Sequence, residues 1–341
     1  MIDLLVAGGG PAGLATAVHA ALAGMEVVVA EPRPGPVDKA CGEGLMPSAV
    51  RHLAALGVVP PGQPLHGIRY LDAAGGASAE AAFRHGHGLG VRRTALHAAL
   101  AARAAELGVT VLPLRVDGVE HGPRSVTAAG VTARHLAVAD GLHSPTRRAL
   151  GLHRPDRPGR PARYGLRRHY PVAPWSRSVE VHWSARAEAY VTPVGPDLVG
   201  VALLTADRAP FDEQLARFPL LAARLPTGAG TAVRGAGPLR QGVRARVAGR
   251  ALLVGDAAGY LDALTGEGLA VALACADELV RCLRSGRPEA YERAWRRASR
   301  RYRLLTGSLL WARGQPLLAS RIVPAAARLP LLFRAGVNLL A

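Results

Sequence analysis

The chain has 341 residues, of which 49% are hydrophobic, and its formal net charge is +17 at pH 7. This length and hydrophobic content exclude general disorder and allow a large core. The basic residues are scattered arginines except for Lys39, and aromatic residues make up only 4%. A nucleic-acid-binding surface needs clustered charge and stacking aromatic rings, so no nucleic-acid partner is expected.

The three cysteines, Cys41, Cys275 and Cys282, have neither the spacing of metal ligands nor that of a disulfide framework. We therefore expect no metal site and a reducing, cytoplasmic location. The apolar N-terminal stretch lacks a basic n-region and carries Asp3, which does not fit a signal peptide. No uninterrupted apolar run reaches about 18 residues, so no transmembrane helix is predicted, and contact with a membrane surface stays open.

The N-terminal segment predicts a dinucleotide-binding βαβ unit. A short apolar strand, residues 2–7, runs into a glycine turn and then into an Ala-rich helix. In the G-x-G-x-x-G spacing the first glycine permits the tight turn, the second admits a pyrophosphate, and the third lets the helix pack on the strand. The free N–H groups of the helix N-terminus attract the phosphates. We therefore expect cofactor contacts from Gly8, Gly10, Pro11, Ala12 and Gly13.

Residues 26–30 predict the second parallel strand, and Glu31 lies at its end. A carboxylate there can accept both hydroxyls of an adenosine ribose and would repel a 2′-phosphate. We count the neighbouring Arg33 among the cofactor-binding residues. The alternative is a glycine-rich turn in an ordinary βαβ unit. It leaves unexplained why strand, glycines, helix, second strand and acid follow in this order.

A glycine-punctuated loop at residues 38–47 precedes a helix expected at 48–56. Beside a dinucleotide site, such a loop is a candidate wall of an active site. Gly42 is expected to contact the cofactor. Cys41 either faces the cofactor or is a small packed thiol, and the sequence leaves both alternatives open.

Residues 65–92 alternate weakly and contain the hairpin signal Gly75-Gly76, so two or three strands are expected to leave the nucleotide lobe here. His85 and His87, two residues apart, face either substrate or solvent. A helix at 93–108 and a third parallel strand at 109–112 then return to the nucleotide lobe. A β-meander is expected at 116–131.

Two apolar segments, residues 136–139 and 250–254, are each followed directly by an Asp and a Gly. Open α/β folds bind ligands at the carboxyl edge of their parallel strands. We therefore expect cofactor contacts from Asp140, Gly141, Gly255 and Asp256.

Residues 163–205 predict a mostly antiparallel sheet, the floor of a second domain. Its strands are expected at 164–170, 179–183, 190–194 and 198–204, and a mixed helical stretch follows at 211–224. A long helix is expected at 269–283, and the rest of the chain is predicted to be helical. The resulting division is a discontinuous nucleotide domain (1–64, 91–160 and 240–285), a sheet domain (65–90 and 161–239) and C-terminal helices (286–341).

Three separated motifs together resemble the FAD-dependent aromatic hydroxylase superfamily, the p-hydroxybenzoate hydroxylase-like proteins. The first motif is the glycine fingerprint with Glu31. The second and third are Asp140-Gly141 with Ser144 and Arg147, and Gly255-Asp256 followed by Gly266-Glu267-Gly268. The proline usual in the third motif is replaced by Ala263.

Two further features refine the resemblance. Arg93 matches the arginine that precedes the family's x-x-Leu helix pattern, and the loop around Cys41 is similar to that of the branch that includes geranylgeranyl reductases. The resemblance implies a two-lobed α/β (α+β) fold, in which a Rossmann-like FAD-binding domain is interleaved with an antiparallel-sheet substrate domain. It also implies FAD as cofactor, with NADH or NADPH as reductant. The implied FAD contacts beyond the first glycines are Glu31, Arg33, Cys41, Gly42, Arg93, Asp140, Gly141, Gly255, Asp256, Gly266, Glu267 and Gly268.

The resemblance predicts a monooxygenase of secondary metabolism that uses NAD(P)H and O₂ to hydroxylate an aromatic ring of polyketide or phenolic-lipid type. Residues 164–170 and 190–193, which are similar to segments of small flavoproteins of secondary metabolism, favour this activity. The alternative is a reductase of isoprenoid or related C=C bonds, favoured by the Cys41 loop and the apolar C-terminal helices. A flavin-free NAD-binding or nucleic-acid-binding module is the third alternative.

The candidate catalytic residues are Cys41, His169 and Tyr190, with His182 as a further group on the predicted sheet. The expected partner is a small aromatic or apolar molecule, and the chain is expected to be a monomer or a homodimer.

Overall fold

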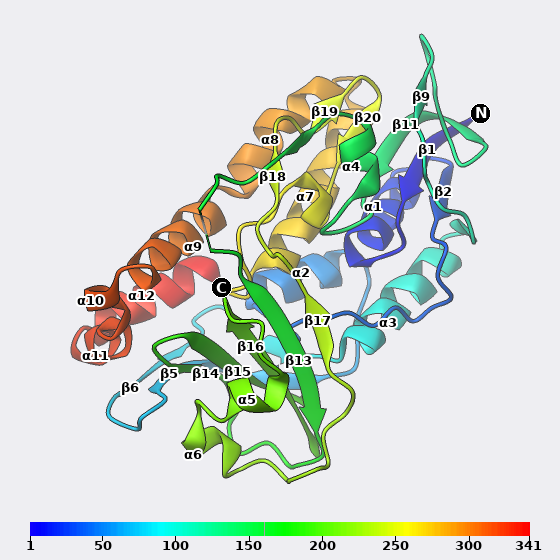
Figure 1. The fold of residues 1–341 in the computed structure, drawn as a ribbon. Helices are drawn as coiled ribbons and strands as arrows, with labels where there is room; N and C mark the ends of the chain where they lie inside the picture. The colour runs from blue at the N-terminus through cyan, green and yellow to red at the C-terminus, as the bar shows by residue number, and fades with distance from the viewer. Residues whose placement is uncertain (160) are drawn as a thin grey trace.

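The computed structural model describes residues 1–159 and 161–341. A largely parallel sheet forms the centre of its first lobe, with the strand order β19-β20-β11-β1-β2-β8, while β9 and β10 extend β11 as an antiparallel ribbon (Figure 1). The strands are β1 (Ile2–Ala7), β2 (Val27–Ala30), β8 (Thr110–Leu112), β9 (Glu120–His121), β10 (Val126–Ala128), β11 (Val131–Val138), β19 (Val247–Ala248) and β20 (Ala251–Leu253). The predicted parallel strands of the nucleotide lobe are thus confirmed, but the end of the meander and the following strand are one element, β11.

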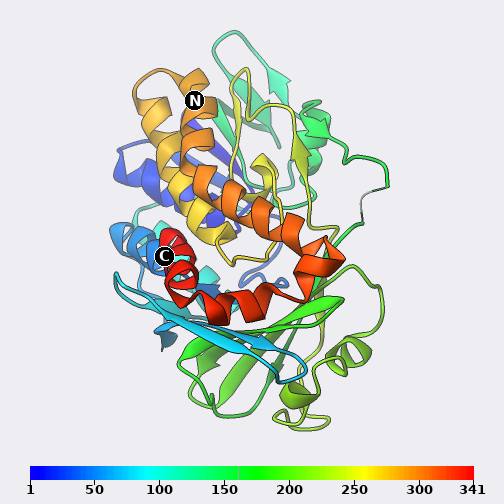
Figure 2. The ribbon, with the colours of Figure 1, turned by 90° about the vertical axis from the view of Figure 1, so that its left-hand side faces the viewer.

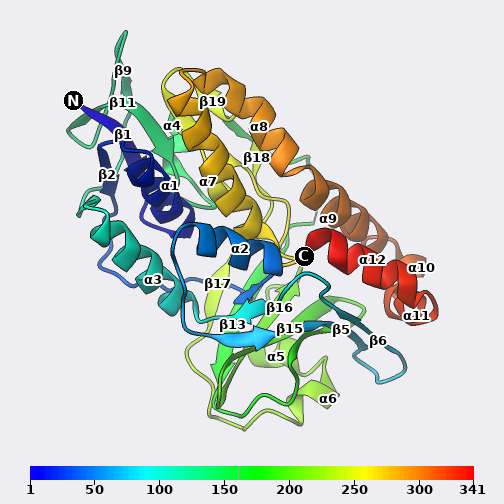
Figure 3. The same cartoon turned by 180° about the vertical axis from the view of Figure 1, so that it is seen from behind.

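Helices α1 (Pro11–Leu22), α3 (Arg93–Glu106) and α7 (Gly268–Arg284) pack against this sheet, with α1 between the other two (Figure 3). Residues 4–7 of β1 and the whole of β20 are apolar runs with buried side chains, and in β2 only Val28 is half-buried, as expected for a parallel sheet covered by helices. Helix α8 (Tyr291–Ala298) packs on α7. The three predicted motifs follow β1, β11 and β20 directly in the chain, so they lie at the carboxyl edge of this sheet.

The second lobe is built on a seven-stranded sheet with the order β17-β13-β16-β15-β14-β5-β6. All neighbours are antiparallel except β5 and β14. The strands are β5 (Gly67–Asp72), β6 (Ser78–Ala82), β13 (Tyr164–Tyr170), β14 (Ser178–Trp183), β15 (Ala187–Gly195), β16 (Leu198–Thr205) and β17 (Arg234–Ala236). One face packs against α5 (Phe211–Leu215) and α6 (Pro219–Ala222), and the other faces the first lobe and the C-terminal helices.

A small sheet with the strand order β3 (Gly44–Leu45), β7 (Gly88–Gly90) and β4 (Gln63–Leu65) lies between the lobes. Helix α2 (Pro47–Ala55) connects β3 to β4 in the chain. We predicted that residues 65–90 belong as a whole to the second sheet, but only the β5–β6 hairpin does. The segment of β7 pairs instead with β3 and β4. Gly90 permits this arrangement, because a Cβ there would collide with the Pro193 carbonyl oxygen.

The C-terminal helices form an arm that leaves the first lobe and folds back over the second sheet (Figure 2). The arm consists of α9 (Arg300–Arg313), α10 (Pro316–Ala319), α11 (Ile322–Arg328) and α12 (Pro330–Leu340). Helices α11 and α12 contact β6, and the chain ends against α2, where Arg51 donates a hydrogen bond of 3.0 Å to the Ala341 carbonyl. Short elements complete the fold, namely α4 (Pro145–Ala149), β12 (His153–Arg154), β18 (Gly242–Val243) and the 3₁₀ turns Gly255–Ala258 and Pro288–Ala290.

Arg147, on α4, ties the second motif to the third. Its side chain is fully buried, and its Nη1 donates to the carbonyl oxygens of Asp256 (3.3 Å) and Ala257 (3.1 Å). Its Nη2 donates to the Leu142 carbonyl (3.0 Å) and to Gln241 Oε1 (2.8 Å). One guanidinium thus bonds four acceptors from three segments of the chain, and its bonds to the Ala257 carbonyl and to Gln241 Oε1 are buried.

We expect Arg147→Met to lower the free energy of unfolding by about 3 kcal/mol, because several acceptors lose their donor at once. Arg148→Met is the matched control, since Arg148 is the exposed neighbour in the same helix. Chemical denaturation of both variants measures the difference. Equal stability of the two variants would contradict this role for Arg147.

Candidate functional site

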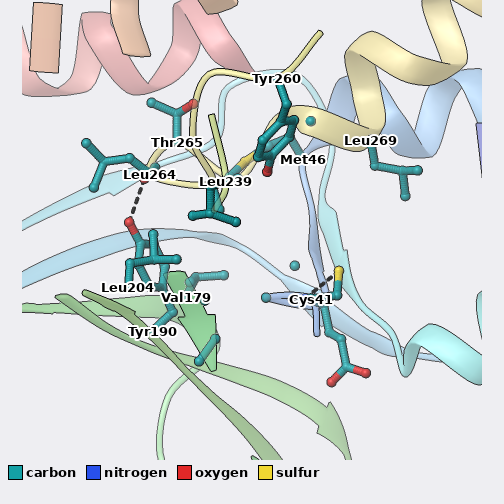
Figure 4. A pocket seen from close by; sticks show the side chains of 18 of the residues that line it. Cys41, Met46, Val179, Tyr190, Leu204, Leu239, Tyr260, Leu264, Thr265 and Leu269 are labelled. Carbon is teal, nitrogen blue, oxygen red and sulfur yellow. Dashed lines mark hydrogen bonds between the residues drawn. The ribbon is translucent and has the colours of Figure 1, made fainter. Parts of the chain in front are cut away.

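A cavity of about 880 Å³ lies where the two lobes and the arm meet (Figure 4). One end is polar and rich in glycine, and the other is apolar. The polar end combines residues from all three predicted motifs with the Cys41 loop. These residues are Gly10, Pro11, Ala12, Lys39, Cys41, Gly42, Arg93, Asp140, Gly141, Gly255, Asp256, Gly266 and Gly268.

The glycine turn has the geometry that its spacing predicts. Gly8 has a positive φ of +107°, and a Cβ on Gly13 would collide with the Gly8 carbonyl oxygen. A Cβ on Gly10, by contrast, would meet no atom within 4 Å, so a ligand can approach the backbone there. The first turn of α1 has no side-chain cap, which leaves its N–H groups for an anion.

Glu31 lies behind this turn and does not itself line the cavity. Its Oε2 accepts the Gly9 N–H at 2.9 Å, and its Oε1 accepts both the backbone N–H (3.0 Å) and Nε (2.7 Å) of Arg33. Burial would raise the pKa of Glu31, but these hydrogen bonds lower it overall. Glu31 is therefore a carboxylate, as ribose binding requires, and Arg33 donates hydrogen bonds to both of its oxygens.

Two buried polar atoms at the cavity, Asp140 Oδ1 and Arg93 Nε, have no hydrogen-bond partner among the described residues. The other carboxylate oxygen of Asp140 accepts the Thr146 N–H at 3.0 Å. Burial raises the pKa of Asp256, against the attraction of Arg93, Lys39 and Arg147. Buried polar groups need partners, and the hydroxyl and phosphate groups of FAD supply them. The residues at this end of the cavity therefore fit FAD.

Lys39 is a site residue that we did not predict from the sequence. A Cβ on Gly141 would lie 3.1 Å from Lys39 Nζ, so the ammonium reaches the second motif. Burial lowers the pKa of Lys39, and the nearby Arg33 and Arg93 lower it further. The available signal was that Lys39 is the single lysine of an Arg-rich chain and stands beside Cys41.

The loop that carries Cys41 is held by a buried contact between Glu43 and His169 of β13. Glu43 has a left-handed backbone (φ +58°), and its Oε2 lies 2.5 Å from His169 Nε2. Its Oε1 accepts the Arg93 N–H at 2.8 Å. Arg167 lies 3.0 Å from His169 Nδ1, and since Arg only donates, Nδ1 accepts and Nε2 carries the proton toward Glu43.

Two further contacts fix the same loop. Arg167, which is fully buried, is paired with Asp38 and donates to the Lys39 carbonyl at 3.3 Å. Thr192 of β15 donates to the Gly42 carbonyl at 2.8 Å. The loop is therefore bonded to the second sheet at several points, and its shape depends on both lobes.

Of the predicted catalytic residues, the structure brings Cys41 and Tyr190 to the cavity but not His169. His169 lies under the loop and positions it. Cys41 faces the cavity, and its Sγ accepts the Glu43 N–H at 3.4 Å (Figure 4). The Tyr190 hydroxyl donates to the Leu264 carbonyl at 2.6 Å, and burial raises its pKa well above the ordinary value. Tyr190 is thus a neutral, engaged wall residue.

The other predicted histidines lie away from the cavity. His182 is buried 3.3 Å from Glu180 on β14, whose alternate residues Val179 and Val181 line the cavity instead. His85 and His87 are exposed, which confirms the solvent-facing alternative.

Glu267, between two cavity-lining glycines, is a buried carboxyl beside the cavity rather than in its lining. Its Oε2 has no partner among the described residues, and burial raises its pKa from 4.5 to about 8. The carboxyl is therefore protonated at neutral pH, at the N-terminus of α7.

The far end of the cavity is an apolar tunnel between the second sheet and the arm. Its lining comes from β5, β14, β15 and β16 on one side and from α9, α11 and α12 on the other. The main residues are Ile68, Tyr70, Val179, Val181, Tyr190, Leu204, Leu239, Leu264, Leu305, Leu309, Ile322, Leu329, Leu332, Phe333, Val337 and Leu340. A cavity end of this composition provides an apolar environment in which a hydrocarbon group would lose its contact with water.

Comparison with known proteins agrees with the cofactor site. Residues 1–162 match the model of an FAD binding domain. Menaquinone reductase of Mycobacterium tuberculosis is 33% identical over 304 residues, which cover 78% of this chain and 72% of the relative. The chain belongs to the FAD-dependent p-hydroxybenzoate hydroxylase-like superfamily.

Members of this superfamily with known structures share the fold at low identity. A geranylgeranyl bacteriochlorophyll reductase-like protein from Thermoplasma acidophilum superposes with a TM-score of 0.78 at 20% identity, over 96% of this chain and 91% of that chain. p-Nitrophenol 4-monooxygenase from Pseudomonas putida gives 0.78 at 19% identity, over 99% and 98%. These structures show that the fold is shared, while the FAD binding domain and the 33%-identical relative identify the chain as an FAD-dependent oxidoreductase.

We expect Asp256→Ala to abolish FAD binding, because it removes the buried carboxylate at the polar end of the cavity. Cys41→Ala is expected to retain FAD, because it deletes only a thiol that lines the cavity. The flavin absorbance per protein, measured after purification, distinguishes the two variants. An Asp256→Ala protein with full flavin content would overturn the assignment of the site.

Glu267 gives a pH-dependent prediction. Its folded pKa of about 8 exceeds the ordinary 4.5, so the folded state binds more protons than the unfolded state between these values. Stability therefore falls as pH rises through this window and levels off above it. Glu267→Gln, which is neutral throughout, is expected to gain Tm relative to wild type as pH rises from 5 to about 8. A Tm difference that does not change with pH would show that Glu267 is not protonated.

Proposed function

We propose that this protein is an FAD-dependent reductase that saturates a C=C bond in a substrate with a long apolar, isoprenoid-type chain. NADH or NADPH supplies the electrons. The observation that carries the proposal is the continuity of the cavity, which runs from the FAD end into the apolar tunnel under α9, α11 and α12. The relatives named menaquinone reductase support the same substrate class, since menaquinone is a quinone with an isoprenoid chain.

The tunnel provides the binding energy for such a chain. Each methylene-sized group moved from water into it contributes about 0.8 kcal/mol, so a few isoprene units suffice for tight binding. Tyr190 forms part of the tunnel wall, and its hydroxyl offers no proton to a substrate because it already donates to the Leu264 carbonyl. The tunnel thus holds the chain without polar contacts, and the double bond is positioned by depth along it.

Reduction of a C=C bond adds a hydride to one carbon and a proton to the other. FAD, when bound and reduced, supplies the hydride. The protein must supply the proton, because an apolar tunnel excludes water. The Cys41 thiol faces the cavity with its Sγ fixed by the Glu43 N–H, and we assign the proton donation to it. The contacts of Glu43 with His169 and Arg93 hold this thiol in place.

Hydroxylation of an aromatic ring is the second candidate. One observation favours it: Tyr70 and Phe333, both in the cavity wall, have ring centroids 4.8 Å apart and form an aromatic surface. Such a surface stacks with a phenolic ring as well as with a quinone. The two functions differ in their need for oxygen, and this difference provides the test.

The holoenzyme is incubated with NADPH or NADH and a polyprenyl quinone, under nitrogen and under labelled oxygen. We expect oxygen-independent turnover and a product that keeps a gain of two hydrogen atoms after its ring is reoxidised to the quinone, as measured by mass spectrometry. A gain that reoxidation removes would mean that only the quinone ring was reduced, and would refute C=C saturation. A product that carries labelled oxygen, with no turnover under nitrogen, would establish hydroxylation and refute the reductase.

Within the same assay, Cys41→Ala is expected to lower kcat by about 10²-fold or more, the usual contribution of a positioned general acid. Cys282→Ala is the matched control, because it also removes one thiol but lies on α7 outside the cavity lining. Undiminished turnover by Cys41→Ala would assign proton donation to another group.

A further inference from the structure

The arm carries most of the exposed large hydrophobic side chains of the molecule. Among the described residues thirteen such side chains are exposed, and eight of them lie between residues 304 and 339. These eight are Leu304, Trp311, Leu317, Leu318, Leu329, Leu331, Leu332 and Leu339. Leu317 and Leu331 are 80% and 74% exposed, so they contribute nothing to the core of this chain. An apolar surface of this extent marks an interaction site.

The same arm is strongly basic. Residues 300–341 contain seven arginines and no Asp or Glu. Arg321, Arg328 and Arg334 are exposed on the segment that carries the exposed leucines. Apolar side chains interspersed with arginines are the composition of a helix that lies in the interface of an anionic bilayer. A second copy of this chain would bring a like charge against this surface.

The arm is shaped to lie on a bilayer rather than to cross it. Among the described residues, no single helix is long and apolar enough to span a membrane. The segments Leu317–Arg328 and Pro330–Leu340 have the length and apolar composition of a membrane span only when they are taken together, and the chain bends by 100° between them. Figure 3 shows α10 and α11 at the outer edge of the molecule, with α12 running back toward α2.

The arm also contains a mouth of the cavity. Leu329 and Leu332 are 53% and 67% exposed, and both also line the tunnel. Their side chains therefore belong to the outer surface and to the tunnel at once. A hydrocarbon chain that leaves a lipid phase at this point enters the tunnel without crossing water.

We propose that the arm formed by α9, α10, α11 and α12 docks on the surface of an anionic phospholipid bilayer and that the apolar substrate enters the tunnel from the bilayer between Leu329 and Leu332. The docking surface is defined by the eight exposed residues given above together with Arg321, Arg328 and Arg334. The route of the substrate rests on the proposed function. The docking itself does not.

The test is flotation of the flavin-loaded full chain with vesicles of phosphatidylglycerol and phosphatidylcholine in equal amounts, and with vesicles of phosphatidylcholine alone. We expect the protein to float with the anionic vesicles, less with the neutral ones, and less as salt is added. The double variant Leu317→Glu/Leu331→Glu is expected to lower the partition coefficient by about a hundredfold, roughly tenfold for each leucine no longer buried in lipid. Neither leucine lines the cavity.

The matched control is Val59→Glu/Leu220→Glu, which adds the same charge at two exposed hydrophobic residues outside the arm. This variant is expected to float like wild type. Unchanged flavin absorbance shows that both variants are folded. Equal loss of flotation in both variants, or no binding of wild type to anionic vesicles, overturns the proposal.

Light scattering measures the oligomeric state and so distinguishes a dimer interface from a membrane-docking surface. A wild-type dimer that Leu317→Glu/Leu331→Glu separates, without vesicle binding by either protein, would identify the arm as an interface between two copies and overturn membrane docking. Flotation requires no turnover, so its failure is distinguishable from a failure of the proposed reductase activity. If the protein floats but reduces no double bond, the docking surface stands and the substrate class is wrong.

Discussion

The contact between Glu43 and His169 is the constraint on which the site depends. It is buried, it joins a loop of the first lobe to a strand of the second, and it fixes a residue with left-handed backbone geometry. A buried carboxylate without a partner is costly, so the loop and the sheet hold this geometry together. The position of Cys41, two residues before Glu43, follows from it. Arg93, whose N–H bonds the same carboxylate, is positioned by it as well.

This constraint explains how two lobes form one continuous cavity. The first lobe supplies the turn of Gly8 to Gly13 and the strand ends at Asp140 and Asp256, which together make the polar end. The second sheet and the arm supply mostly apolar side chains, with Tyr70, Tyr190, Thr192 and Ser308 as the polar members of the lining. The Cys41 loop lies at the junction, bonded to the second sheet through Arg167 and Thr192. In the proposed function, chemistry at the junction and binding along the tunnel are therefore tasks of different segments.

The cofactor half of the site could be predicted from the sequence because local patterns determine it. Glycine spacing, a buried strand and an Asp at its end all act over a few residues, and the structure places Gly10, Asp140 and Asp256 at one cavity. Three strands of the second sheet, β13, β14 and β16, were predicted to within one residue for the same reason, whereas β15 begins three residues before the predicted strand and β17 was not predicted. The sequence placed His169 on a strand of the second sheet, but it could not show that a loop more than a hundred residues earlier covers it.

The substrate half could not be predicted, because it depends on long-range packing. Whether Leu309, Phe333 and Val337 face a core or a tunnel is decided by where the arm folds back, and helical periodicity does not specify this. Lys39 was missed because a single charged residue in a loop has no pattern. The segment at residues 65–90 was assigned to one sheet because alternation identifies strands but not their partners.

The central claim is that one cavity joins the flavin to a chain-binding tunnel, with Cys41 at the junction. A crystal structure of the enzyme with FAD and a polyprenyl quinone tests it most directly. The account predicts the flavin ring between Gly266 and the Cys41 loop, and the isoprenoid chain along Tyr190, Leu309 and Phe333 toward Leu332. A substrate chain bound outside this tunnel, or a flavin whose ring lies away from Cys41, would contradict it.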